Sequence, residues 1–251
     1  MRYRMVGIAA HQLLATSYRI ETPRTSIERM FQPSCIARAS ILLCCLFQAA
    51  GAAAATLIVA VQTSDGRPLP GTVLSLHPLT EKGLNRSDPP AAPVNAVMDQ
   101  VNRAFVPDLL VIPVGSTVSF PNSDSVSHQI YSFSAAHKFQ LPLYRGKPYP
   151  PVHFDQAGIV TLGCNIHDSM LAYVLVTDAP YFGRTDAAGS WSADVPRGTY
   201  RVTVWHPRMQ EDSPLEREIM LGDSDRAALT LRLAKALQPA PLEGRHSWDS
   251  Y

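Results

Sequence analysis

The chain has 251 residues, of which 46% are hydrophobic and 17% are charged, and its formal net charge is +1. This length allows one large or two small domains with real cores, and the composition excludes a mainly disordered protein. The four cysteines and the near-neutral charge first allow two disulfides or a hidden basic face. Both numbers change once the N-terminal segment is considered separately.

An export signal is predicted for residues 1–55. Arg38 precedes the uncharged stretch ASILLCCLFQAAGAAAA, which ends in small-residue pairs such as Ala53 and Ala55. A positive start, a short apolar run and small residues are the order of a secretory signal. We expect the true start at Met30 and a periplasmic mature protein without stable membrane insertion. A membrane anchor is the weaker alternative, because the residues after Ala55 are typical of a strand that runs into a turn.

Removal of this segment changes the charge and the cysteine inventory. It takes away six arginines and two glutamates, which leaves a net charge of about −3 with neutral histidines. No block of lysine and arginine remains, so we expect no nucleic-acid partner. Cys164 is then the only cysteine of the mature chain. An unpaired thiol in an oxidising compartment has to be buried, catalytic or bound to metal.

Short β-branched runs separated by Gly and Pro fill residues 56–234, and no long stretch has helical periodicity. This pattern predicts an all-β sandwich or barrel with little helix. In chain order, the predicted strands cover residues 57–62, 72–77, 109–114, 117–120, 129–133, 159–164, 171–177, 200–205 and 228–233. Residues 79–93 and 146–151 are typical of loops, and residues 236–251 of a frayed tail.

Two stretches resemble the halves of a small transthyretin-like or carboxypeptidase-regulatory-like β module. They are VAVQTSDGRPLPG at 59–71 and the segment from TDAAG to PRGTYRV at 185–202. Two layouts stay open. In the first, residues 56–178 form the central domain and residues 179–235 form the second module. In the second, residues 56–80 pair with the C-terminal module, and the central domain is an insertion.

A group of metal-binding side chains follows one of the predicted central strands. Alternation along that strand points Cys164 inward together with Val160 and Leu162. The turn after it holds His167 and Met170 in a Cys-x-x-His-x-x-Met arrangement. Thiolate and thioether favour reduced copper, and imidazole suits both oxidation states. The set therefore fits a copper site that changes its oxidation state.

A second imidazole has to come from another strand, and His128 is the best candidate. Two nitrogens, one thiolate and a weak axial thioether describe a blue-copper electron-transfer site. A centre bridged by two thiolates is excluded by the single cysteine, and zinc fits less well because its structural sites seldom use Met. A hydrolase dyad of Cys164 and His128 is the enzymatic alternative. It is disfavoured because no positive charge or helix start activates the thiol.

These residues resemble a known family. Phe120-x-Asn122 followed by His128, and GIVTLGC running into the Cys-x-x-His-x-x-Met turn, are similar to the cupredoxins, with amicyanin-like ligand spacing. Segments such as YSFS and PYF resemble exported bacterial cupredoxin-like proteins labelled methylamine utilization proteins. The resemblance covers about residues 56–234 and implies a Greek-key β-sandwich beside the second module.

The resemblance also implies a function. It implies a non-enzymatic periplasmic carrier with one type 1 copper ion, which passes single electrons between redox partners such as a dehydrogenase and a cytochrome. Carried over by position, the copper ligands and the residue that pins the surrounding loop are His128, Cys164, His167, Met170 and Asn122. We expect His167 to be the electron port, because a ligand on a connecting loop lies nearer the surface than one on a strand.

Two departures from the family pattern bear on partner choice more than on metal binding. Gln129 stands where cupredoxins commonly have Asn after the first ligand, and the turn carries polar Asp168 and Ser169. The alternative function is a periplasmic copper-delivery protein or a metal-free interaction module on the same scaffold.

Overall fold

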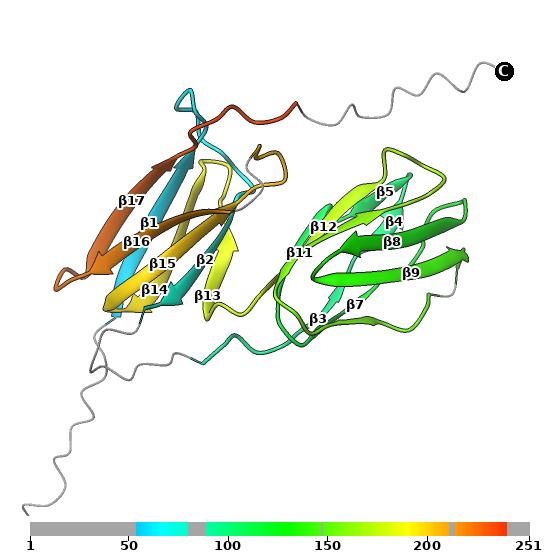
Figure 1. Ribbon diagram of the computed structural model, residues 1–251, viewed down its shortest axis with the longest axis horizontal. Coiled ribbons are helices and arrows are strands. Elements are labelled where there is room, and N and C mark those ends of the chain that lie inside the picture. The colour runs from blue at the N-terminus through cyan, green and yellow to red at the C-terminus, as the bar shows by residue number, and fades with distance from the viewer. Residues whose placement is uncertain (1–53, 80–88, 147, 211–213, 240–251) are drawn as a thin grey trace, which may run out of the picture. The chain divides into compact units, whose positions relative to one another are not determined.

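The computed structural model describes residues 54–79, 89–146, 148–210 and 214–239 (Figure 1). Residues 1–53 of the predicted export segment and residues 240–251 of the predicted tail lie outside these ranges. Ala54 and Ala55, the last two residues of the predicted signal, begin the first strand, and Ala55 is 1% exposed. The described residues contain no helix, and therefore none long and apolar enough to cross a membrane.

The all-β prediction is confirmed for the described residues, and each predicted strand is present. These strands are β1 (Ala54–Gln62), β2 (Val73–Pro78), β6 (Leu109–Pro113), β7 (Ser116–Ser119), β8 (His128–Ser134), β11 (Gly158–Gly163), β12 (Leu171–Thr177), β15 (Gly198–Trp205) and β17 (Arg226–Arg232). The strands that were not predicted are β3 (Asn95–Val97), β4 (Asp99–Val101), β5 (Ala104–Val106), β9 (His137–Tyr144), β10 (Val152–Phe154), β13 (Tyr181–Arg184), β14 (Ser190–Pro196) and β16 (Leu215–Leu221).

The first two strands pair with strands from the C-terminal part of the chain. β1 lies between β14, which is antiparallel to it, and β17, which is parallel to it. β2 lies between β13 and β15, and β16 completes that sheet. Alternate residues of β1, such as Leu57 and Val59, are fully buried in one core with Tyr200 and Val202 of β15. This strand pairing is the one that the second layout describes.

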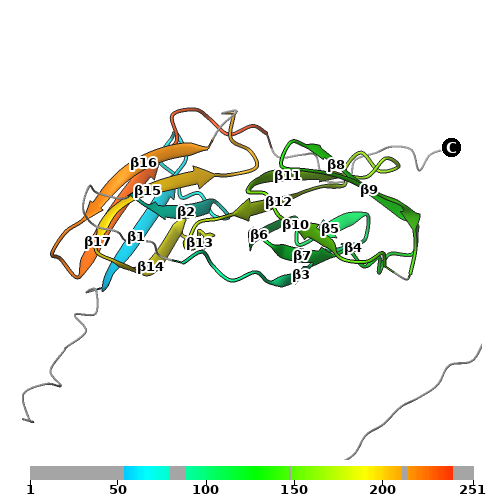
Figure 2. The same ribbon diagram turned by 60° about the horizontal axis from the view of Figure 1, so that its bottom comes forward.

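The chain between β2 and β13 forms a second sandwich with its own core. One sheet has the order β6-β12-β11-β8-β9, and the other has the order β10-β7-β3. The chain crosses from sheet to sheet at β6–β7–β8 and again at β9–β10–β11, as a Greek-key sandwich requires. Figure 2 shows β3 and β7 on one face and β8, β11 and β12 on the other.

Alternation along β11 explains how this core forms. Val160 and Leu162 are fully buried, whereas Thr161 between them is exposed. They share a core cluster with Phe120 and Phe154 from the opposite side of the sandwich. Full burial of each such aliphatic side chain contributes about 1.5–3 kcal/mol. The inward face predicted for this strand is therefore correct, and it leads directly to Cys164 at the end of the strand.

A half-buried histidine after β15 makes the stability of the protein depend on pH. Burial, with repulsion from Arg208 and Arg184 and a smaller opposing effect of Asp108, lowers the pKa of His206 to about 4. Its neutral Nδ1 accepts a hydrogen bond from the Arg208 amide at 3.1 Å. Below the ordinary pKa of about 6.5, His206 is protonated in the unfolded chain but stays neutral in the folded chain. Stability is therefore lost as the pH falls from about 6.5 toward 4.

We expect His206→Asn to remove this dependence, because Asn offers an acceptor that does not titrate. Between pH 7 and pH 4.5 the wild type should lose about 1–2 kcal/mol more unfolding free energy than the variant; the side chain is partly open to solvent, which reduces the effect. Urea titrations at each pH measure this difference. His153→Asn, at an exposed position of β10, is the control and should keep the wild-type profile. Parallel profiles for wild type and His206→Asn would contradict the assignment.

Candidate metal centre

Three candidate ligands from two parts of the sequence converge at one end of the central sandwich. The ligand atoms of His128, Cys164 and His167 all lie within 4.8 Å of one another. His128 Nδ1 lies 3.1 Å from His167 Nδ1 and 4.0 Å from Cys164 Sγ. His128 is fully buried, Cys164 is 3% exposed and His167 is half-buried. A thiol and two imidazoles thus meet where little water can reach them.

The strand order of the larger sheet brings these residues together. β8, which begins at His128, is a direct neighbour of β11, whose last residue precedes Cys164. Gly163 faces Tyr131 of β8, and a Cβ at position 163 would lie 2.8 Å from the Tyr131 ring. A larger residue at this position would have to displace the end of the Tyr131 side chain. The pairing of Gly163 with Tyr131 places the start of one strand beside the end of the other.

A tight turn between β11 and β12 supplies the rest of the predicted set. The Met170 amide donates to the His167 carbonyl at 3.0 Å, which closes the turn. Met170 is 2% exposed and belongs to the same core cluster as Cys164. Burial first, and then His128 and Arg103, lower the pKa of His167. A neutral imidazole at this position keeps a lone pair that can bind a metal.

Asn122 makes the hydrogen bonds that close the loop before His128. Its Nδ2 donates to the carbonyls of Val126 at 3.1 Å and Tyr144 at 2.9 Å. Its Oδ1 accepts from the Asp124 amide at 3.0 Å. The side chain therefore connects three backbone groups around the loop.

We expect Asn122→Ala to destabilise the protein by about 2–4 kcal/mol, because it removes one buried and two partly buried hydrogen bonds and leaves their partners unpaired. Asn165→Ala is the matched control. Asn165 follows Cys164, but it is exposed and bonds the Gln129 side chain at 3.0 Å. Its loss should cost no more than about 0.5 kcal/mol. Chemical denaturation measures both values, and equal losses would show that Asn122 does not hold the loop.

A buried carboxylate beside the site was not predicted. Asp124 Oδ2 lies 2.9 Å from His128 Nε2 and accepts from the Arg103 amide at 2.7 Å. The hydrogen bond from His128, followed by that from Arg103, holds the pKa of Asp124 at about 2. The signal in the sequence was the Asp-x-x-x-His spacing that ends at His128.

A second polar network behind the loop was also not predicted. The Tyr144 hydroxyl donates to the Phe120 carbonyl at 2.6 Å and accepts from Gln100 Nε2. Burial raises the pKa of Tyr144 to about 12. Gln100 Nε2 also donates to the Pro121 carbonyl at 3.0 Å. These bonds fix the strand end that leads into Asn122.

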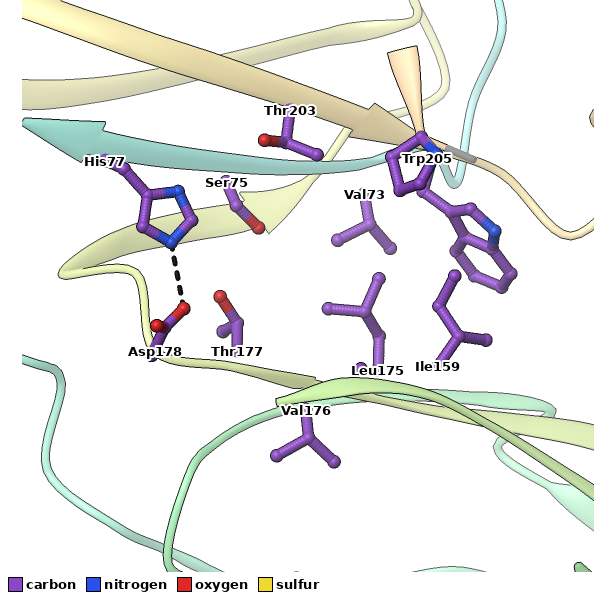
Figure 3. Close-up of a pocket in the computed structure, with 12 residues that line it drawn as sticks. Val73, Ser75, His77, Ile159, Leu175, Val176, Thr177, Asp178, Thr203 and Trp205 are labelled. Atoms are coloured by element: carbon purple, nitrogen blue, oxygen red, sulfur yellow. Dashed lines mark hydrogen bonds and ion pairs between the residues drawn. The ribbon is translucent and has the colours of Figure 1, made fainter. Parts of the chain in front are cut away.

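A cavity of about 250 Å³ is present elsewhere in the described residues (Figure 3). Its walls come from β2, β11, β12 and β15 and from the ends of these strands, and they are mainly apolar. The main polar feature is His77 Nε2, which lies 2.9 Å from Asp178 Oδ1. None of the candidate metal ligands lines this cavity, so it is not part of the site described above.

Comparisons with known proteins gave matches among solved structures alone; no family model and no curated protein sequence matches the chain. A purple cupredoxin from Nitrosopumilus maritimus is 27% identical, with a TM-score of 0.30, covering 33% of this chain and 99% of that one. The copper-containing nitrite reductase NirK from Thermus scotoductus SA-01 is 26% identical, with a TM-score of 0.31. The match covers 40% of this chain and 25% of the reductase.

A pseudoazurin from Sinorhizobium is 18% identical, with a TM-score of 0.27. The match covers 34% of this chain and 76% of the pseudoazurin. The matched structures thus include cupredoxins and also an enzyme. TM-scores this low do not assign a function, and the proposal below rests on the residues of this chain.

Proposed function

We propose that this protein is a mononuclear copper electron carrier. The convergence of one thiol and two imidazoles within 4.8 Å, two of them buried and the third half-buried, is the observation that carries the proposal. His128 and His167 would be the nitrogen ligands, Cys164 the thiolate ligand, and Met170 a weak thioether ligand. The protein would not be an enzyme, since an electron carrier needs no group that binds and transforms a substrate.

The chemistry of the donors supports copper as the metal. One soft thiolate with two imidazoles suits an ion that changes between its two oxidation states, whereas structural zinc takes more thiolates. His128 donates from Nε2 to Asp124, so its Nδ1, which lies 3.1 Å from His167 Nδ1, keeps a lone pair that can bind a metal. Cys164 is the single free cysteine among the described residues, which excludes a two-copper centre bridged by two thiolates.

The ligand residues would support electron transfer because their positions are fixed by the surrounding fold. Copper, when bound, would supply a one-electron couple. His128 and Cys164 adjoin central strands of the larger sheet, and the hydrogen bonds of Asn122 fix the loop before His128. Preorganised ligands need little rearrangement when the oxidation state changes, and a dry shell tunes the potential.

His167 would be the route by which electrons enter and leave. It is half-buried, unlike the two fully buried positions of the site, and Ile166 beside it is 53% exposed. A partner that contacts this turn would come close to a ligand of the metal. We propose periplasmic redox proteins as partners, an electron donor such as a dehydrogenase and an acceptor such as a cytochrome, after export directed by residues 1–55.

A Cu(II) titration of the purified protein tests this function. It should take up one Cu(II) per chain with an intense visible band from sulfur-to-copper charge transfer, which ascorbate bleaches and a mild oxidant restores over repeated cycles. A protein that stays colourless with Cu(II) would contradict the carrier function. Tight binding of Cu(I) without a stable Cu(II) form would instead identify a copper-delivery protein.

A further inference from the structure

The ring nitrogen of His128 that does not face Cys164 is bound to a carboxylate. Asp124 Oδ2 lies 2.9 Å from His128 Nε2, while His128 Nδ1 lies 4.0 Å from Cys164 Sγ. An ionised carboxylate can only accept a hydrogen bond, so Nε2 carries the proton and Nδ1 keeps its lone pair. The bond therefore selects the tautomer whose free nitrogen faces the thiol.

Backbone hydrogen bonds fix the Asp124 carboxylate in this position. Its side chain is 8% exposed, and that of His128 is fully buried. Oδ2 also accepts from the Arg103 amide at 2.7 Å, and Oδ1 accepts from the Ser125 amide at 2.7 Å. Both oxygens are thus occupied by N–H donors, which favour the ionised form and prevent rotation of the carboxylate.

The Arg103 donor comes from a turn with an uncommon backbone. Asn102 and Arg103 connect β4 to β5 with φ angles of 51° and 59°, in the left-handed region that residues other than glycine rarely adopt. This conformation directs the Arg103 amide at Asp124, about twenty residues further along the chain. A separate hairpin therefore fixes the carboxylate against His128.

We propose that Asp124 is a positioning residue that strengthens His128 as a copper ligand and lowers the reduction potential of the site. A charged acceptor on the distal N–H pushes electron density toward the ligating nitrogen. A buried negative charge nearby also stabilises Cu(II) more than Cu(I), and the dry surroundings screen it little. This inference rests on the proposed copper function.

The test compares Asp124→Ala and Asp124→Asn with wild type in Cu(II) affinity, Cu(I) affinity and reduction potential. Asp124→Ala should weaken Cu(II) binding about 10–100-fold and Cu(I) binding less. Each tenfold change in the ratio of the two affinities raises the potential by about 59 mV. Asp124→Asn, which keeps an acceptor for the backbone donors, should show a smaller rise and serves if the Ala variant does not fold.

Asp168→Asn is the matched control, because it removes the same charge at an exposed position beside His167. Solvent and salt screen that charge. The ratio of Cu(II) to Cu(I) affinity of the Asp168→Asn variant should therefore stay within about twofold of wild type. NMR of the imidazole nitrogens in the metal-free protein gives a readout that does not depend on copper. Wild-type His128 should carry its proton on Nε2, and Asp124→Ala should lose this preference.

The failures of the two proposals can be told apart. A wild type that takes up no copper overturns the proposed function and the role of Asp124 together. A wild type that shows the charge-transfer band while Asp124→Ala keeps both the potential and the His128 tautomer overturns the role of Asp124 alone. A rise in potential equal to that of Asp168→Asn would likewise show that general charge, and not the hydrogen bond, is responsible.

Discussion

Cys164→Ser protein with Cu(II) should lack the intense visible band and bind the ion at least about 100-fold more weakly than wild type, a larger loss than removal of a supporting group causes. The band requires a thiolate, and Cys164 is the free cysteine of the described residues. Serine keeps the shape of the side chain but offers a hard hydroxyl that seldom ionises. Visible absorption and competitive copper titration measure the two effects.

Cys164→Ala is the control for folding, because it removes the donor without burying a new hydroxyl in a position that is 3% exposed. It should be equally colourless, with unfolding free energy within about 1–2 kcal/mol of wild type. A Cys164→Ser protein as blue as wild type would place the copper elsewhere.

His167→Gly should lose the wild-type band, and added imidazole should restore it. His167 is half-buried on a turn, so its removal opens a position that a small free ligand can reach from solvent. His128→Gly is the matched control. His128 is fully buried and its ring bonds Asp124, so free imidazole should not replace it and the protein should lose about 3–5 kcal/mol of stability.

Titration of each variant with imidazole in the presence of Cu(II), followed by visible and EPR spectra, checks this pair. An unchanged spectrum for His167→Gly would remove His167 from the ligand set. If imidazole restored the band of His167→Gly and His128→Gly equally, burial would not determine which histidine free imidazole can replace.

The strands that could be predicted are those with an alternating, β-branched core face. β11 is such a strand, because Val160 and Leu162 alternate with exposed Thr161. β9 was missed because it contains Pro142 and no β-branched residue; it lies at the edge of its sheet, where proline is tolerated. β3, β4, β5 and β10 have three residues each, too few for a periodic signal.

The pairing of distant strands could not be read from the sequence. Thr56 of β1 lies opposite Arg226 of β17 in a parallel pair, although almost the whole mature chain separates them. The two stretches that resemble halves of one module, at residues 59–71 and 185–202, allowed this layout without deciding it. The decision depends on long-range packing of the two halves around one core, which local patterns do not contain.

Some residues of the candidate site could be predicted from the sequence, and others only the structure shows. Cys164, His167 and Met170 stand within one short turn, so their spacing reveals them. His128 was predicted from its residue type and its place before a strand, and the structure brings it to Cys164. Asp124, Gln100 and Tyr144 were missed because their importance lies in contacts across the fold, such as that between Gln100 and Tyr144.

X-ray absorption at the copper edge of the loaded protein tests most directly whether this chain holds copper with His128, Cys164 and His167. The spectrum of the Cu(II) form should show one short copper–sulfur distance and two imidazole nitrogens per ion. After reduction the same ligands should remain, with only small changes in distance. A copper ion surrounded by nitrogen and oxygen alone, with no sulfur in either state, would contradict the proposed site.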